Sequence, residues 1–396
     1  MNRFLLAPNS FKGTLSAVEV CDILEAALLC HIPDASIEKQ PMADGGDGMT
    51  DVLLRIIGGQ KCSAVVTGPE GIPVIAEYAV LTDGSAVLEM AEAAGMKKMT
   101  GAANPLYTTT AGVGELLLLF KASGIKHVIL GLGGSATNDT GIGMAYALGW
   151  RFLGTDDHQV EPFAAHLGRI ERIIPPESSL GMDITVACDV CAPLCGDSGA
   201  TAIFGPQKGV TDNLYPILEE GICHFADVLA GWSGMDIALV PGAGAAGGLG
   251  AAVMALLGGR LVSGIELVLR MSRFDQLLAK TDMVLTGEGC LDGQSAQDKA
   301  TVGIARAARN ADIPCVALCG TLGDGAERMY HQGLTAMFAA SGTYTNDIEM
   351  RERCRADYAR LADAFARLMA GIKGVDHRHG ENYSKGVEQN EDDHHS

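Results

Sequence analysis

Aromatic residues are scarce in this chain: Phe, Trp and Tyr together make up 5% of its 396 residues, and charged residues make up 19%. Glycine, by contrast, occurs 51 times, and 47% of the residues are hydrophobic. This composition excludes intrinsic disorder for most of the chain. A core built from Ala, Val, Ile and Leu with frequent glycine turns favours an α/β protein, and the length favours two domains.

Basic residues are also few. The chain has 29 Lys and Arg against 48 Asp and Glu, a formal net charge of −19. Such a field repels polyanions, so we expect no general binding to nucleic acid or to an anionic membrane surface. It does not exclude ATP, because Mg²⁺, a few lysines and helix N-termini can hold a small anion locally.

Signals for export or membrane insertion are missing from the sequence. The first apolar run, residues 4–7, is interrupted at once by Pro8, and the uncharged segment 237–259 contains Pro241 and many glycines. We interpret that segment as a buried loop and helix. These features predict a soluble, cytoplasmic protein.

The eleven cysteines form an odd number, which favours free thiols in a reducing compartment. Cys188, Cys191 and Cys195 have a spacing that could suit a metal, but no fourth Cys or His lies nearby in the sequence. Buried or incidental cysteines are the favoured interpretation.

Short apolar runs alternate with helical periodicity along the chain. Strands are predicted at 3–8, 37–41, 283–285, 315–318 and 337–340, and Ser16 with Glu19 forms a capping box before a helix. Segments 74–80 and 86–90 flank a Thr-Asp-Gly turn, which predicts an antiparallel hairpin.

This order predicts a discontinuous, doubly wound parallel-sheet domain, residues 1–68 and 265–375, with a mixed α/β domain, residues 69–264, inserted into it. Residues 376–396 are polar, carry four of the ten histidines and lack apolar periodicity, so we predict a disordered tail. The oligomeric state stays open, a homodimer included.

Two glycine-rich segments raise nucleotide hypotheses. No Gly-x-x-x-x-Gly-Lys-Ser/Thr occurs, which excludes a P-loop enzyme. Gly242-x-Gly244-x-x-Gly247 matches the dinucleotide fingerprint, but Pro241 and the local wealth of glycine make an NAD-dependent dehydrogenase a weak alternative. Residues 131–139 follow a predicted strand and precede a helix, so their backbone N–H groups could bind an anion, or the glycines could serve only a tight crossing.

Polar residues follow several of the predicted strands. They are Asn9, Ser10 and Lys12 after the first strand, Asp44 with Asp47, Asp189, and Glu288 with Asp292. Ligands bind beyond the carboxyl ends of strands in open α/β sheets, and acids with a lysine suit phosphoryl transfer. Helix capping is the competing explanation for each residue taken alone.

Eight segments in register closely resemble the motifs of the bacterial glycerate kinase family of the glycerate 2-kinase type. They are LAPNSFKG (6–13), MADGGDG (42–48), TTAGVGE (109–115), LGLGGSATND (130–139), ACDV (187–190), IFGPQKG (203–209), VPGAGAAGG (240–248) and LTGEG (285–289). The resemblance spans about residues 1–370. It implies a flavodoxin-like domain interrupted by a second α/β domain, an active site in the cleft between them, MgATP as donor, D-glycerate as acceptor and 2-phosphoglycerate as product.

In this light we assign roles as hypotheses. Asp189 is the general base, Lys12 with Lys208 or Lys299 stabilises transferring charge, and Asp44 and Glu288 position Mg²⁺ or substrate hydroxyls. The remaining predicted substrate- or nucleotide-binding residues are Ser10, Gly133, Gly134, Ser135, Thr137 and Asp292.

The chain departs from the family pattern at a few positions. Thr140 and Asp298 stand where glycine is usual, Cys290 replaces an arginine, and Cys191 and Ala192 replace a polar residue and an asparagine. The lost arginine and asparagine keep a second hypothesis open, a family member that binds glycerate or nucleotide but catalyses poorly.

Overall fold

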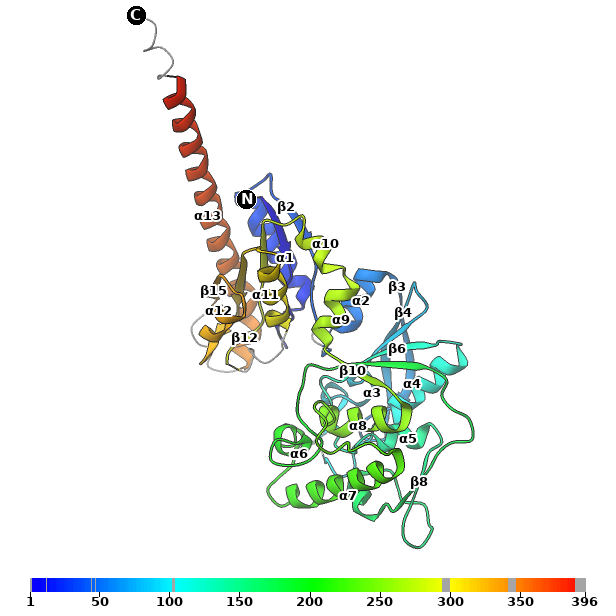
Figure 1. Ribbon diagram of the computed structural model, residues 1–396. Coiled ribbons are helices and arrows are strands. Elements are labelled where there is room, and N and C mark those ends of the chain that lie inside the picture. Colours follow the sequence, from blue (N-terminus) through cyan, green and yellow to red (C-terminus); the bar gives the residue numbers. More distant parts are fainter. Residues whose placement is uncertain are drawn as a thin grey trace, which may run out of the picture. The chain divides into compact units, whose positions relative to one another are not determined.

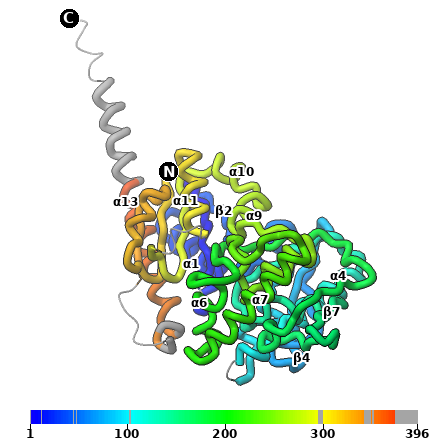
Figure 2. Tube along the Cα trace, turned by 60° about the horizontal axis from the view of Figure 1, so that its bottom comes forward, coloured from blue at the N-terminus to red at the C-terminus, as the bar shows by residue number. Residues whose placement is uncertain are grey.

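The structure, a computed structural model, describes residues 2–11, 13–43, 45–46, 48–101, 104–293, 300–340 and 347–388. The chain forms two compact units. The first unit joins Met1–Met42 to Arg273–Ser396, and the second unit is Ala43–Ser272. In Figure 1 the blue start of the chain and its yellow to red end therefore belong to one unit, and Figure 2 follows the same path as a tube.

The first unit is built on five parallel strands in the order β15-β13-β11-β1-β2. They are β1 (Arg3–Leu6), β2 (Ser36–Lys39), β11 (Met283–Thr286), β13 (Cys315–Cys319) and β15 (Ala336–Ala339). The chain passes from β1 to β2 on one side and later adds β11, β13 and β15 on the other. This is the flavodoxin-like order, and it confirms the predicted doubly wound, parallel-sheet domain.

Helices cover both faces of this sheet. Helix α1 (Ala17–His31) starts at the predicted capping box of Ser16 and Glu19, and it packs against α13 (Asp347–Glu388). Alternate strand residues, Leu6 and Leu285 among them, join the core beneath these two helices, whereas α11 (Ala300–Asn310) contacts β11 and β13. The unit also contains α10 (Phe274–Leu278), β12 (Cys290–Leu291), β14 (Thr321–Leu322), η4 (Ala326–Arg328) and α12 (Met329–Gln332).

The end of α13 enters the segment for which disorder was predicted. Its described core contacts run from Cys354 to Ala370, and the helical backbone continues to Glu388. Residues 389–396 lie outside the described residues, and the disorder of that end stays a prediction.

The second unit contains a mixed sheet in the order β10-β9-β6-β5-β4-β3. The strands are β3 (Gly59–Thr67), β4 (Pro73–Leu81), β5 (Ala86–Glu89), β6 (His127–Gly131), β9 (Asp183–Ala187) and β10 (Arg260–Val262). Strands β5, β6, β9 and β10 are mutually parallel, whereas β4 pairs antiparallel with β3 and β5. The predicted hairpin and the mixed α/β character of the inserted unit are confirmed.

The core of the second unit follows the two-residue period of its strands. Leu88, Leu130 and Val186 belong to one cluster with residues of α4, α5, α7 and α8. Helices α2 and α9 contact each other and the sheet. The helical elements are α2 (Met49–Ile57), α3 (Ala91–Ala94), η1 (Met96–Lys98), α4 (Ala111–Ala122), α5 (Ile142–Ala147), η2 (Ala164–Arg169), α6 (Ala200–Phe204), η3 (Pro206–Lys208), α7 (Tyr215–Ser233), α8 (Ala245–Leu257) and α9 (Gly264–Met271), with a small β7 (Arg151–Leu153)–β8 (Arg172–Ile174) pair.

The structure divides the chain at other points than the predicted 68/69 and 264/265. Strand β3 pairs with β4 along its whole length, and α2 packs on β4 and β5, so residues 43–68 belong to the second unit. Helix α9 contacts α2 and β9 and stays with them. Within the described ranges, no helix has both the length and the apolar character needed to cross a membrane.

Candidate active site

In the first unit, the carboxyl ends of β1 and β11 lie side by side where the strand order reverses. A cavity of about 320 Å³ opens there, and we call it the edge cavity. Its described lining is Asn9, Ser10, Phe11, Thr14, Glu288, Gly289, Cys290, Asp292, Gly320, Thr321, Ala340, Cys354 and Tyr358. Ligands of open α/β sheets bind at such a reversal.

Backbone hydrogen bonds hold the loops around the edge cavity together. The N–H of Asn9 donates to the carbonyl of Gly287 at 2.9 Å, and the N–H of Gly320 donates to the carbonyl of Glu288 at 3.1 Å. The backbones approach so closely that a Cβ on Gly287, where φ is +158°, would lie 1.9 Å from the carbonyl oxygen of Leu318. The loops after β1, β11 and β13 are therefore fixed against one another.

The edge cavity brings three of the predicted site residues together: Ser10, Glu288 and Asp292 all line it. Glu288 is 8% exposed, so its carboxylate is largely removed from water. The predictions for Lys12, Asp44 and Lys299 fall outside the described residues.

In the second unit, the carboxyl ends of β5, β6, β9 and β10 share one edge of the sheet. The described part of the Met42–Gly48 motif lies against this edge. The N–H of Gly133 donates to the carbonyl of Gly45 at 3.3 Å, and a Cβ on Gly133 would come within 2.4 Å of the Gly46 Cα. The structure thus gathers the 42–48 and 130–139 motifs, far apart in sequence, at one edge.

Asp189 follows β9 at this edge, as predicted, and caps helix α9. Its Oδ1 accepts hydrogen bonds from the Ser263 hydroxyl and the Gly264 N–H, both at 2.8 Å, and its Oδ2 accepts one from the Ile265 N–H at 3.1 Å. Carboxylates at helix N-termini satisfy otherwise unpaired N–H groups. The capping explanation that the sequence left open therefore applies to Asp189, whatever else the carboxylate does.

The glycine-rich loop, residues 131–139, uses much of its backbone for the fold itself. The N–H groups of Leu132, Gly133 and Ala136 donate to carbonyls of neighbouring segments. Ser135 is buried, and Thr137 is fully buried with no hydrogen-bond partner for its hydroxyl in the described part of the chain. Gly134 is exposed at the tip of this loop. The anion-site prediction thus centres on Gly134, because the Gly133 N–H already has an acceptor.

Lys208 lies beneath this loop and not at its surface. The side chain is 1% exposed, and its Nζ donates to the carbonyl oxygen of Thr137 at 2.7 Å. Burial lowers the pKa of the Lys208 ammonium to about 7, while the nearby Asp139 carboxylate acts in the opposite direction. In this arrangement Lys208 stabilises the glycine-rich loop from its buried side.

Asp139 is a central residue that the sequence reasoning did not single out. Its fully buried carboxylate accepts bonds from the Thr110 N–H and hydroxyl and from the N–H groups of Gly141 and Gly143. Burial raises its pKa against the effect of these donors. Asp139 thereby ties the start of α4 to the glycine-rich loop. The only sequence signal for Asp139 was its position at the end of the glycine-rich motif, 130–139, that follows a predicted strand.

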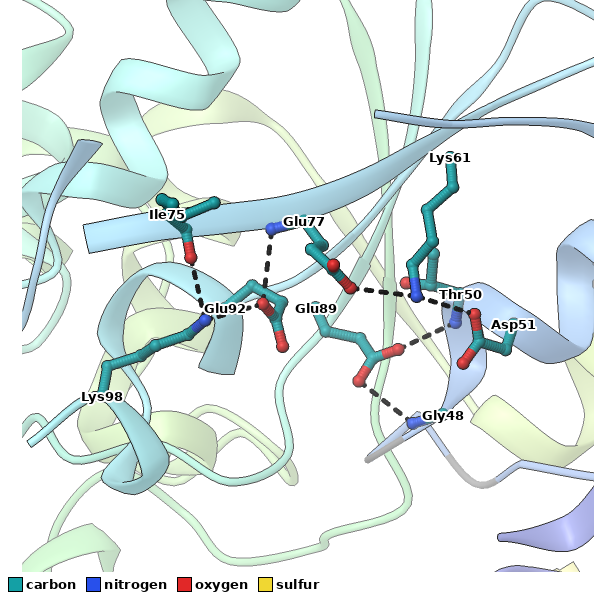
Figure 3. Close-up of polar contacts among 9 residues, drawn as sticks. All are labelled: Gly48, Thr50, Asp51, Lys61, Ile75, Glu77, Glu89, Glu92 and Lys98. Atoms are coloured by element: carbon teal, nitrogen blue, oxygen red, sulfur yellow. Dashed lines mark hydrogen bonds and ion pairs between the residues drawn. The ribbon is translucent and has the colours of Figure 1, made fainter. Parts of the chain in front are cut away.

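Glu89, at the end of β5, is a second residue that the sequence reasoning did not single out. Figure 3 shows its carboxylate accepting hydrogen bonds from the N–H groups of Gly48, at 3.1 Å, and Thr50, at 2.8 Å. These bonds fix the N-terminal turn of α2 and, with it, the end of the 42–48 motif that carries Asp44. The neighbouring Lys61 pairs with Asp51 and Glu77 on the surface.

The dinucleotide fingerprint at Gly242–Gly247 lies in a different setting from the one that a dehydrogenase needs. It follows turns after α7, and no strand leads directly into it, as residues 234–241 show. A Cβ on Gly247, where φ is +66°, would lie 2.1 Å from the Thr137 carbonyl oxygen. The glycine therefore serves a close approach of two backbones, and the dehydrogenase alternative loses its support.

The cysteine cluster also has no metal-like geometry. Nowhere in the described ranges do three His, Cys, Asp or Glu side chains converge as a metal site would require. Cys191 is exposed, whereas Cys195 is buried, with its pKa raised by burial.

The chain was compared with known proteins. The sequence model described as "Glycerate kinase family" matches residues 4–370. A glycerate kinase from Halalkalibacterium halodurans is 39% identical over 86% of this chain and 90% of its own length, and the glycerate 2-kinase of Escherichia coli K12 is 38% identical over 85% and 90%. A crystal structure from Salmonella typhimurium LT2, provisionally designated glycerate kinase 2, has a TM-score of 0.79 at 35% identity and covers 94% of this chain and 99% of its own. The chain belongs to the glycerate kinase family.

Proposed function

We propose that this chain is an ATP-dependent glycerate kinase that phosphorylates D-glycerate to 2-phosphoglycerate. The observation that carries the proposal is the family match over residues 4–370, together with a relative of 38% identity designated glycerate 2-kinase. The geometry agrees with it, since acids and hydroxyls gather beyond the carboxyl ends of parallel strands.

The chain's own residues supply positioning and electrostatics, which dominate phosphoryl transfer. We propose Asp189 as the general base for the glycerate hydroxyl. Its carboxylate accepts three hydrogen bonds from the Ser263–Ile265 segment. The capping contacts hold the carboxylate in one orientation, which a general base requires. Lys12 and Lys299 are proposed to stabilise the transferring phosphoryl group.

Mg²⁺ fits the donors that are present. Mg²⁺ in phosphotransferases takes one or two carboxylates together with phosphate oxygens and water, and Glu288 lines the edge cavity beside Asp292. We propose Glu288 as a protein ligand of the ion, whereas the role predicted for Asp44, which lies outside the described residues, stays a prediction. When bound, the ion neutralises charge on the phosphates.

An assay of ADP release tests the activity. Wild-type protein with MgATP should release ADP with D-glycerate and far more slowly with lactate, which lacks the primary hydroxyl. Lys12→Met should reduce turnover at least ~10²-fold, the scale of a lost preorganised charge. If wild-type protein binds glycerate yet releases no ADP, the weakened family member becomes the correct description.

A further inference from the structure

The edge cavity of the first unit has the size and lining of a nucleoside site. Its volume of about 320 Å³ lies within the range of pockets that enclose drug-sized molecules. Glycerate, a three-carbon acid, would leave much of such a space unfilled. The cavity therefore suits the larger substrate of the reaction.

One wall of the cavity is apolar and aromatic. Phe11 and Tyr358 pack edge to face, with ring centroids 4.9 Å apart, and Ala340 and Cys354 continue this wall. Both rings are buried and belong to the core shared by α1 and α13, so the wall is rigid. Tyr358 is 0% and Phe11 3% exposed, so the two rings form the closed end of the cavity, and a flat base that enters it meets a wall that loses little side-chain entropy.

The described polar lining of the cavity suits the hydroxyl groups of a sugar. It includes two carboxylates, Glu288 and Asp292. Ribose hydroxyls are natural donors to a carboxylate. Ser10 and Thr321 add neutral hydrogen-bonding groups.

We propose that the edge cavity binds the adenosine part of ATP, with the base at the end closed by Phe11 and Tyr358 and the ribose hydroxyls donating to Asp292. The phosphates then lie towards Glu288, the proposed Mg²⁺ ligand. This inference rests on the proposed kinase function and assigns the nucleotide to the first unit.

Adenosine itself is the probe, since it is neutral, carries no phosphate and can be tested in EDTA. Its binding to the full chain is measured by saturation-transfer NMR and calorimetry, beside D-glycerate. Ala340→Leu fills the cavity and should raise both the dissociation constant for adenosine and the KM for ATP at least tenfold, with glycerate affinity within twofold of wild type. Ala279→Leu, the same change at an exposed position of the same unit, should alter none of these values.

A second variant, which is nearly isosteric, keeps the test decisive if Ala340→Leu does not fold. Asp292→Asn should weaken adenosine binding at least threefold and leave binding of the free base adenine unchanged. The inference is overturned if wild-type protein binds ATP but not adenosine, or if Ala340→Leu weakens glycerate binding while adenosine binding persists. A protein that binds adenosine through this cavity but releases no ADP would refute only the kinase function.

Discussion

The single residue Asp189 is both a helix cap and the proposed general base, and one substitution separates the two roles. Asp189→Asn retains one oxygen but turns an amide NH₂ towards N–H and hydroxyl donors of the Ser263–Ile265 segment. We expect a loss of about 1 kcal/mol in the free energy of unfolding from the weakened cap. If Asp189 is also the base, turnover falls ~10²–10⁴-fold with ATP affinity nearly intact. Thermal unfolding and steady-state kinetics measure the two effects.

Ser263→Ala is the matched control for Asp189→Asn, because it weakens the same cap and leaves the carboxylate in place. Equal losses of turnover in Ser263→Ala and Asp189→Asn would show that Asp189 has a structural role and is not the general base.

Lys208 makes the stability of the second unit depend on pH in a defined direction. Its pKa is about 7 in the folded chain, below the ordinary value of 10.5, so the unfolded chain binds more protons between these pH values. The contribution of Lys208 to the free energy of unfolding therefore rises as the pH increases from about 7 towards 10.5, and this contribution is lowest below pH 7. Lys208→Met should flatten this part of the profile of melting temperature against pH. An unchanged slope would show that the ammonium is not desolvated.

Thr140 occupies a backbone conformation that suits glycine. Its φ is +49°, it is fully buried, and its hydroxyl has no hydrogen-bond partner in the described part of the chain. The left-handed conformation costs a residue with a Cβ about 1–2 kcal/mol, which exceeds the added chain entropy of glycine. Thr140→Gly should keep or raise the melting temperature. A fall of several degrees would mean that the threonine methyl contributes more than the strain costs.

At the scale of elements, close backbone contacts position the segment that carries Asp44. A Cβ on Gly133 would lie 2.4 Å from the Gly46 Cα, and backbone cannot move aside as a side chain can. Gly133→Ala should therefore displace residues 43–48 and reduce turnover at least tenfold. The control is Gly231→Ala, at an exposed position of α7 where nothing lies within 4 Å of the added Cβ. This substitution should be neutral or stabilising.

Elements whose signals are local could be predicted from the sequence, and those that depend on tertiary pairing could not. The capping box of Ser16 and Glu19 and the buried strands β1, β11 and β13 depend on short-range pattern and were found. Strand β3 is mostly exposed, so it shows no apolar run, and its pairing with β4 decides the domain boundary.

The same limit applies to the site. Ser10, Glu288 and Asp292 follow strands at one sheet edge, and that rule sufficed to bring them together. The burial of Lys208 could not be foreseen, because lysine is ordinarily exposed and its acceptor, the Thr137 carbonyl, lies 71 residues away in the sequence. The four donors to Asp139 are likewise brought together only by the fold.

At the scale of the whole molecule, the end of the chain should be dispensable. The last described residue of α13 that packs on the core is Ala370, and the sequence beyond Gly374 carries no apolar periodicity. Stopping the chain after Gly374 should leave melting temperature and turnover nearly unchanged. A loss of several degrees would show that the removed residues pack.

The product formed by the whole enzyme tests the proposed function most directly. Incubation with D-glycerate and MgATP, followed by ³¹P and ¹³C NMR of the unfractionated mixture, distinguishes a phosphate on the secondary hydroxyl from one on the primary hydroxyl. We expect 2-phosphoglycerate to form in equal amount to ADP, with no 3-phosphoglycerate at early times. Formation of 3-phosphoglycerate as the first product, or ADP without phosphorylated glycerate, would contradict it.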